Sequence, residues 1–142
     1  VSAVDTPLTV EAINQMVAEQ FPGSSNRCLE LGDDYAIAVY DVADRAIRPG
    51  GVISGPTQIG LADGALWYMA VAALGRIEPM ALTSEVSIRY LRPAQGTRLL
   101  SRADLESRSR RSVVGTCHVW VDGLPDKITA AAQGTYAVPL PR

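Results

Sequence analysis

Residues 56–75 read PTQIGLADGALWYMAVAALG, and this stretch decides the fold. As a helix it would carry apolar side chains on nearly every side, which is typical of a helix buried within a protein. Pro56 suits the first turn, where the N–H that proline lacks would have no helical partner. We therefore expect one long central helix over residues 56–75, with the rest of the chain wrapped around it.

The segments outside this helix have mainly the patterns of strands. Strands are predicted at residues 27–31, 35–42, 82–91, 97–106, 113–121 and 127–138. Short turns separate most of them, which favours antiparallel meander pairing. Residues 43–55 contain glycine and proline turn signals and are expected to be irregular. One buried helix with about six antiparallel strands predicts an α+β fold.

The N-terminal part has the pattern of a short amphipathic helix over residues 7–20. Thr9 can cap this helix, and Ile13, Met16 and Val17 fall on one face. The chain has 142 residues, enough for one domain with its own core. We expect a single domain over residues 1–142, in which residues 1–25 form the N-terminal helix and the lead-in to the sheet.

Composition argues against several classes of function. The formal charge is −2, which argues against nucleic acid as a partner. Cys28 and Cys117 are far apart and, with the single His118, too few for a structural zinc site, so no metal is expected. The start of the chain has no signal-peptide pattern, and the apolar run at residues 59–74 is short for a membrane span. We expect reduced thiols, no membrane partner and a cytoplasmic location.

Asp63 is the residue most suggestive of chemistry. No Lys or Arg occurs between residues 49 and 75, so no neighbour on the helix can pair with this carboxylate. A buried, unpaired carboxylate is costly, so Asp63 must have hydrogen-bond partners, be neutral or face a cleft. Two interpretations stay open: a base or nucleophile at a pocket, or a carboxylate bonded to a loop or a neighbouring chain.

The segment from Ser54 to Thr57 opens the predicted helix. Free N–H groups at a helix N-terminus, including that of Gly55, can bind a carbonyl oxygen that becomes an oxyanion. Ordinary capping by Ser54 would explain the same residues. Asp63 lies about 12 Å further along the helix axis. Only a second chain, with the helices head to tail, would bring the two together.

Three motifs together resemble a known family. The run SGPTQIGLAD at residues 54–63 resembles the H-G-G-x-x-x-x-L-A-D signature of the PaaI-like hotdog-fold acyl-CoA thioesterases. The strand ending SIRYLRP at residues 87–93 is similar to that family's strand ending F-L-R-P, and AAAQGTY at residues 130–136 to its final strand. The similarity covers about residues 26–138.

This resemblance implies a hotdog fold, with one long central helix wrapped by an antiparallel sheet of five to seven strands. It also implies homodimers or homotetramers with active sites at the subunit interface, a catalytic carboxylate at Asp63 and an oxyanion-binding N–H at Gly55. Two positions depart from the family. Ser54 replaces its histidine and cannot act as that acid or base, and Pro56 replaces its second glycine and removes an N–H. Ser54, Pro56 and Thr57 remain candidate substrate contacts.

Other candidate residues lie outside the three motifs. Arg110 and Arg111, with Arg108, suggest contacts with coenzyme A phosphates, or simply a solvated basic turn. Trp67 shares a helix face with Asp63 and would wall an acyl pocket, or pack in the core. Ser84, with Thr83, would reach the site of a neighbouring subunit, as the equivalent strand does in the family. His118 is expected to be a packed or hydrogen-bonded strand residue.

The favoured function is therefore an acyl-CoA thioesterase, which needs no metal or redox cofactor. One alternative is a non-catalytic hotdog module that binds acyl-CoA or only oligomerises, which the serine at residue 54 would favour. Another is a hotdog dehydratase or hydratase. It ranks last, because such enzymes need a histidine near the carboxylate and His118 is on a distant strand.

Overall fold

The computed structural model describes residues 7–140, so the first six and last two residues of the expected 1–142 domain lie outside it. In chain order its elements are α1 (Val10–Gln20), β1 (Asn26–Leu31), β2 (Tyr35–Asp41), the 3₁₀ helix η2 (Asp44–Ala46), β3 (Ile47–Arg48), β4 (Val52–Ile53), α2 (Gly55–Leu74), β5 (Leu82–Tyr90), β6 (Arg98–Arg108), β7 (Ser112–Val121) and β8 (Ala130–Ala137). The segment 43–55, expected to be irregular, thus contains a 3₁₀ turn and the short β3–β4 pair.

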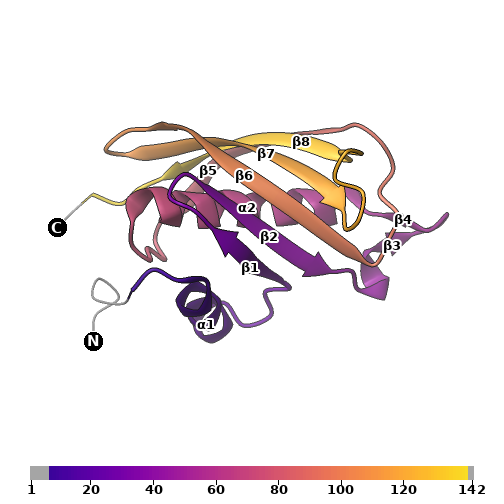
Figure 1. Cartoon of the computed structure of the whole chain (residues 1–142), viewed down its shortest axis with the longest axis horizontal. Coiled ribbons are helices and arrows are strands. Elements are labelled where there is room, and N and C mark those ends of the chain that lie inside the picture. The colour runs from indigo at the N-terminus through magenta and orange to yellow at the C-terminus, as the bar shows by residue number, and fades with distance from the viewer. Residues whose placement is uncertain (1–6, 141–142) are drawn as a thin grey trace.

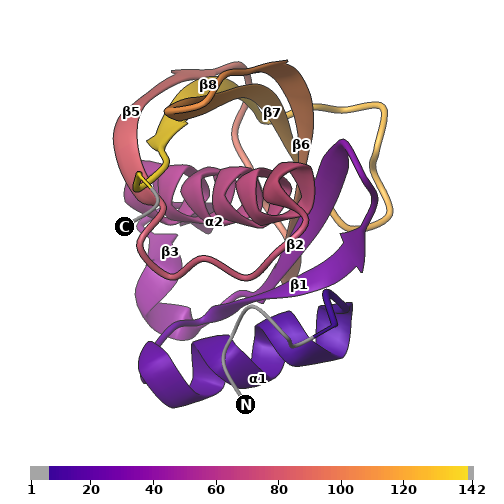
Figure 2. The same cartoon turned by 90° about the vertical axis from the view of Figure 1, so that its left-hand side faces the viewer.

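Six strands form one antiparallel sheet in the order β1-β2-β6-β7-β8-β5. Figures 1 and 2 show this sheet curling around α2, with α1 outside it next to β1. The structure confirms the predicted α+β fold, a long central helix inside an antiparallel sheet of five to seven strands.

The predicted meander is wrong at one link. β6, β7 and β8 do pair in series, but β5 pairs with β8 and not with β6, while β6 pairs with β2. The link at residues 91–97 is therefore a crossover rather than a hairpin turn. It is tied down where Ala94 accepts a hydrogen bond from the N–H of Ile53, and Thr97 one from Val42. Short turns between predicted strands do not reveal such a crossover, because the sequence pattern does not show which strands pair.

Two glycines let the sheet approach α2 closely. A Cβ at Gly115 of β7 would lie 2.5 Å from the terminal methyl of Met69, and one at Gly134 of β8 would lie 2.7 Å from Leu66. The helix side chains therefore fill the space that the glycines leave, and both are fully buried. Burying a side chain of this size contributes about 1.5–3 kcal/mol to folding.

α2 is not buried on every side, contrary to the expectation from its composition. Pro56 and Gly60 are exposed, and Ile59, Asp63 and Trp67 are only half-buried. These residues lie along the side of the helix that the sheet leaves open, so Asp63 has access to the surface of the protomer.

α1 packs on the outer side of β1. Thr9 caps it by accepting a hydrogen bond from the N–H of Ala12, as predicted. Asn14 exchanges two hydrogen bonds with the backbone of Cys28, at 2.8 and 2.9 Å, which fixes α1 against the strand. The predicted face is buried, namely Ile13, Met16 and Val17. This attachment places the end of α1 beside the open side of α2.

Candidate functional site

Two hydroxyl groups hold the carboxylate of Asp63. Tyr136 donates to Oδ1 at 2.5 Å and also contacts the backbone carbonyl of Asp63 at 3.1 Å. Thr83 donates to Oδ1 at 3.0 Å and lies 3.3 Å from Oδ2. Within residues 7–140, no Lys or Arg forms an ion pair with Asp63. Asp63 therefore has neutral hydrogen-bond donors and no cation as its partners.

A register shift in β5 brings the two donors together. Thr83 lies directly opposite Tyr136 of β8, and Glu85 lies opposite the preceding residue, Thr135. Ser84 is the extra residue between them, as in a β-bulge. Because side chains alternate along a strand, the extra residue turns Thr83 to the same face as Val86, toward α2.

Tyr136 remains a donor at neutral pH. Its pKa is raised, first by burial and then by its hydrogen bond to the Asp63 carboxylate, because both disfavour a phenolate. The hydroxyl proton therefore stays available to the carboxylate.

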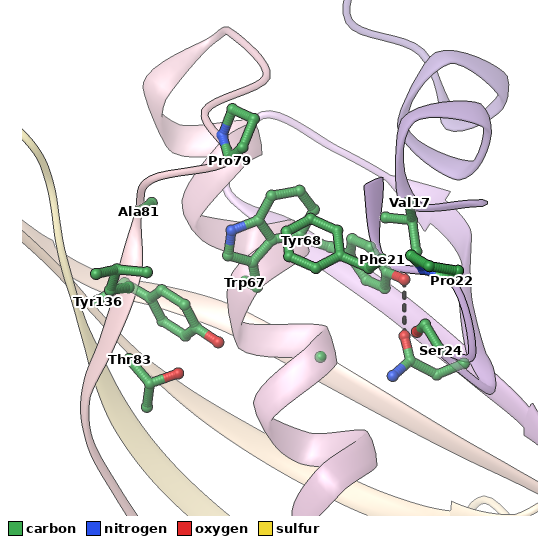
Figure 3. A pocket seen from close by; sticks show the side chains of 13 residues that line it. Val17, Phe21, Pro22, Ser24, Trp67, Tyr68, Pro79, Ala81, Thr83 and Tyr136 are labelled. Carbon is green, nitrogen blue, oxygen red and sulfur yellow. Dashed lines mark hydrogen bonds between the residues drawn. The ribbon is translucent and has the colours of Figure 1, made fainter. Parts of the chain in front are cut away.

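A cavity of about 440 Å³ adjoins this carboxylate. Thr83, Tyr136 and Gly64 line one side of it, next to Asp63. Figure 3 shows Trp67 and Tyr68 of α2 between that side and Phe21, and the hydroxyl groups of Thr83 and Tyr136 point toward α2. The remaining lining is mostly apolar: Val17, Pro22, Ser24, Asn26, Pro79, Ala81 and Leu82. An apolar group attached to a carbonyl at Asp63 would fit here.

The N-terminus of α2 is shaped by its cap and by Tyr90. Ser54 accepts a hydrogen bond from the N–H of Thr57 at 3.3 Å, and their hydroxyl oxygens lie 2.7 Å apart. The N–H of Gly55 makes no hydrogen bond to any residue in 7–140. Tyr90 of β5 donates to the carbonyl of Gly55 at 2.7 Å and thereby fixes this turn. The hydroxyl of Ser54 is thus engaged in capping, while the N–H of Gly55 is left without a partner among the described residues.

A second cavity, of about 380 Å³, lies beside the first turns of α2. Pro56, Thr57 and Gly60 line it, together with the exposed Arg45. Asn26 lines both cavities. The two hollows therefore follow one side of α2, and Asn26 lies where they meet.

Gly55 and Asp63 lie on the same helix, eight residues apart. This spacing corresponds to about 12 Å along the axis. One protomer therefore does not bring the candidate oxyanion donor to the carboxylate.

The remaining sequence candidates are spread around the molecule. Trp67 lines the cavity beside Asp63 and meets Phe21 edge to face, with 6.4 Å between ring centroids. Ser84 is at the bulge and lines neither cavity. Arg110 and Arg111 are exposed in the β6–β7 turn.

Two further residues differ from their expected surroundings. Arg108 donates to the carbonyl of Ala73 at 2.5 Å and so separates from the arginine cluster to cap the C-terminal end of α2. His118 is exposed on β7 rather than packed, because it belongs to the outer face of the sheet.

The described residues hold no arrangement for a metal ion and no membrane span. Within residues 7–140, no three His, Cys, Asp or Glu side chains gather as a metal site would need. No helix in the same range is long and apolar enough to cross a bilayer.

A family model described as the thioesterase superfamily matches residues 50–126. This match covers more than half of the chain and includes Gly55, Asp63 and Thr83. The chain belongs to the thioesterase superfamily. No curated protein sequence matches this superfamily member.

Solved structures agree with this assignment. A candidate thioesterase from Silicibacter sp. TM1040 has a TM-score of 0.82 and 26% identity, with 97% of this chain and 96% of that chain covered. A conserved protein from Pseudomonas aeruginosa has a TM-score of 0.74 and 26% identity, covering 92% and 98%. A point mutant of the phenylacetic acid degradation protein PaaI from Thermus thermophilus shares the fold at 22% identity and a TM-score of 0.68, covering 81% and 94%. These likenesses identify the fold of this thioesterase superfamily member as the hotdog fold, of the PaaI-like type.

Sequence reasoning missed two residues of this site. Tyr136 is the last residue of the G-T-Y motif, which identifies the final strand but gives the tyrosine no role, although a buried tyrosine usually needs a partner for its hydroxyl. Asn26 precedes the first predicted strand and had no recognisable signal, because its position depends on α2, some 40 residues away.

Proposed function

We propose that this protein is an acyl-CoA thioesterase in which Asp63 is the catalytic carboxylate. The observation that carries the proposal is the Asp63 carboxylate, held by Thr83 and Tyr136 beside an apolar cavity, in a member of the thioesterase superfamily. The acyl group enters this cavity, where Trp67 forms a wall.

The hydrogen bonds distinguish the two oxygens of Asp63. Oδ1 accepts from both Tyr136 and Thr83, whereas Oδ2 has only the 3.3 Å contact with Thr83. Oδ2 is therefore the reacting oxygen. As a general base it takes a proton from water while the water oxygen adds to the thioester carbonyl carbon. The C–S bond then breaks, the thiolate takes up the proton, and a carboxylic acid and coenzyme A are released.

Gly55 of a second copy supplies the oxyanion site. Its N–H lies at a helix N-terminus and makes no hydrogen bond within residues 7–140, so it can donate to the carbonyl oxygen as negative charge develops there. Ser54, Pro56 and Thr57 surround this donor and contact the substrate next to the carbonyl.

The functional unit is a homodimer, alone or within a homotetramer. β5 is an edge strand of the sheet, with no partner on its outer side within residues 7–140. Leu82 and Tyr90 at its ends are exposed, as are Met80 and Leu91 just beyond it. An unpaired edge strand with exposed apolar side chains at both ends is suited to pairing with a second copy. Such pairing would also bring Ser84 to the neighbouring site.

Arg110 and Arg111 complete the substrate contacts by binding the phosphates of coenzyme A. The proposed location is the cytoplasm. In its support, Cys28 and Cys117 are buried free thiols, the state expected of cysteines in a reducing compartment.

The decisive test is Asp63→Asn, assayed as free-thiol release from a panel of acyl-CoA esters. Turnover should fall by at least about a hundredfold, because the amide keeps the shape of the carboxylate but not its basicity. The melting temperature should stay level or rise, since a neutral amide is cheaper to bury. Asp122→Asn, in the exposed β7–β8 turn, is the matched control and should keep wild-type turnover.

Two outcomes would contradict the proposal. Full hydrolysis by Asp63→Asn would make the residue structural. Absence of hydrolysis by the wild-type protein across the whole panel would favour the non-catalytic acyl-CoA-binding module instead. Single turnover in ¹⁸O-labelled water tests for a nucleophilic Asp63, because label in its own carboxylate arises only when water attacks the Asp63 carbonyl of a covalent acyl intermediate.

A further inference from the structure

Asn26 occupies the junction of the two cavities. It is the first residue of β1, and it lines both the apolar cavity beside Asp63 and the polar one beside the start of α2. Its amide lies directly over Gly64, where a Cβ would meet Nδ2 at 2.9 Å. Only glycine at this position of α2 lets the amide lie against the helix, one residue from Asp63.

A hydrogen bond fixes which end of the amide is free. Tyr68 donates to Oδ1 of Asn26 at 2.7 Å, the dashed line in Figure 3. Tyr68 is 2% exposed, and burial raises its pKa, so its hydroxyl stays a donor at neutral pH. Oδ1 is therefore committed as an acceptor, and Nδ2 is left with two N–H groups to donate.

Nδ2 has no acceptor among residues 7–140. It is also not sealed in the interior, because no buried side-chain nitrogen or oxygen in that range lacks a hydrogen-bond partner. The donor is thus accessible, lies next to an oxygen bonded by Tyr68, and has no acceptor among the described residues. Its residue, Asn26, lines the same cavity as Thr83 and Tyr136, which donate to the carboxylate.

The rest of the cavity decides the kind of acceptor that fits. No Lys, Arg or His lines it, and the Asp63 carboxylate that adjoins it is negative, whereas Arg45 lines the other cavity. An anionic group would find no cation there and would meet repulsion. A neutral oxygen on an otherwise apolar acyl chain would accept a hydrogen bond from the Asn26 amide. The rest of the chain would stay in contact with the apolar walls.

We infer that Asn26 is a specificity-determining residue, and that the preferred acyl group carries a neutral oxygen, a hydroxyl or oxo group, that accepts a hydrogen bond from its Nδ2. This inference rests on the proposed function, since the acyl group is taken to enter the cavity from a thioester at Asp63. A site built to bond a substrate oxygen rejects the analogue that lacks it, because its own donor is then left unpaired.

The test compares acyl groups that differ by a single oxygen. Hydroxyhexanoyl-CoA isomers and oxohexanoyl-CoA are assayed against hexanoyl-CoA, and kcat/KM is measured for each. Wild-type protein should prefer at least one oxygenated ester by about tenfold or more, the usual effect of one hydrogen bond. Asn26→Asp keeps the acceptor for Tyr68 but removes both N–H donors, so this preference should disappear. Tyr68→Phe, which keeps the donors, should retain a preference for the oxygenated ester.

Binding gives a second measurement that does not depend on turnover. Non-hydrolysable thioether analogues of the same pairs are titrated into wild-type protein and Asn26→Asp by calorimetry, with circular dichroism as the check on folding. Equal affinity of the wild type for both members of every pair would overturn the inference, even if the esters are hydrolysed. An unchanged preference in Asn26→Asp, or a stronger preference for an adipoyl ester with its terminal carboxylate, would overturn it too. Loss of hydrolysis with the binding preference intact would instead refute the proposed function alone.

Discussion

Asp63 has hydroxyl groups rather than a cation as its hydrogen-bond partners, and this choice of partner affects what the carboxylate can do. A bound Arg or Lys would favour the charged form strongly and occupy the oxygen that must react. Tyr136 and Thr83 instead direct their protons mainly to Oδ1. The carboxylate is thereby oriented, while Oδ2 stays available to a water molecule or a carbonyl carbon.

Removal of either donor should therefore lower turnover without unfolding the protein. We expect Tyr136→Phe and Thr83→Val each to reduce kcat by about tenfold, the scale of one hydrogen bond that orients a catalytic group. Tyr136→Phe should also cost about 1 kcal/mol of stability, since it leaves acceptors at Asp63 with one donor fewer. Steady-state kinetics and thermal melts measure both effects.

Thr83→Ser is the control for this pair, because it retains the hydroxyl and should keep most of the activity. Unchanged kcat in both Tyr136→Phe and Thr83→Val would show that the hydrogen bonds only stabilise the fold.

At the scale of elements, the arginines at the end of β6 and in the β6–β7 turn have two different roles. Arg108 donates to the carbonyl of Ala73 at the C-terminal end of α2, where a cation also suits the helix dipole. Arg110 and Arg111 extend beyond this contact and are exposed, and within residues 7–140 neither forms an ion pair. The turn therefore presents two unpaired cations to solvent.

Replacing Arg110 and Arg111 together by Ala should raise KM for acyl-CoA, but not for a short thioester that lacks the nucleotide. The difference in KM for acyl-CoA between wild type and variant should shrink as salt is added, because exposed charges are screened. Lys127→Ala, in the exposed β7–β8 connection, is the control for loss of a positive charge. Equal losses for the two substrates would identify the turn as an ordinary solvated one.

At the scale of the whole molecule, the proposed site needs two chains. The distance along α2 keeps Gly55 away from Asp63 of the same protomer, and β5 offers an unpaired edge for a second copy. Each dimer would then contain two composite sites, each with the carboxylate from one chain and the N–H from the other.

Mixed dimers test this arrangement. Asp63→Asn and Gly55→Ala should each be nearly inactive alone, the latter because its Cβ would crowd the helix mouth at 3.1 Å from the Tyr90 hydroxyl. Co-expressed with two different tags, they should recover about a quarter of wild-type activity, since half of the dimers are mixed and contain one intact site. Activity no greater than that of the separate variants would mean that the two groups do not act across chains, and a monomer in light scattering would exclude the scheme.

The central helix was predictable because its limits are encoded locally. The expected range of 56–75 differs from Gly55–Leu74 by one residue at each end. Ser54 caps the start, and Gly75 ends the helix in the left-handed conformation, with φ of 72°. The position of Asp63 on this helix was predictable for the same reason.

The surroundings of Asp63 were harder to predict, because they depend on contacts between distant segments. Thr83 and Tyr136 meet at the carboxylate because β8 pairs with β5, whereas the short link after β5 suggested pairing with β6. Regular alternation from Val86 places Ser84 on the inner face, and the register shift places Thr83 there instead. Sequence periodicity identifies strands but does not detect one extra residue within them.

That extra residue has a consequence at the level of the gene. Loss of the Ser84 codon would remove the surplus from β5 and leave Thr83 opposite Tyr136. Loss of the Thr83 codon would bring Ser84 into the same place, so either deletion would keep an alcohol side chain against Asp63. A codon lost from the middle of β8 would instead turn one half of that strand over relative to the sheet. Loss of the Thr83 or Ser84 codon should therefore be less damaging than loss of a codon from the middle of β8 in any population under selection for this activity.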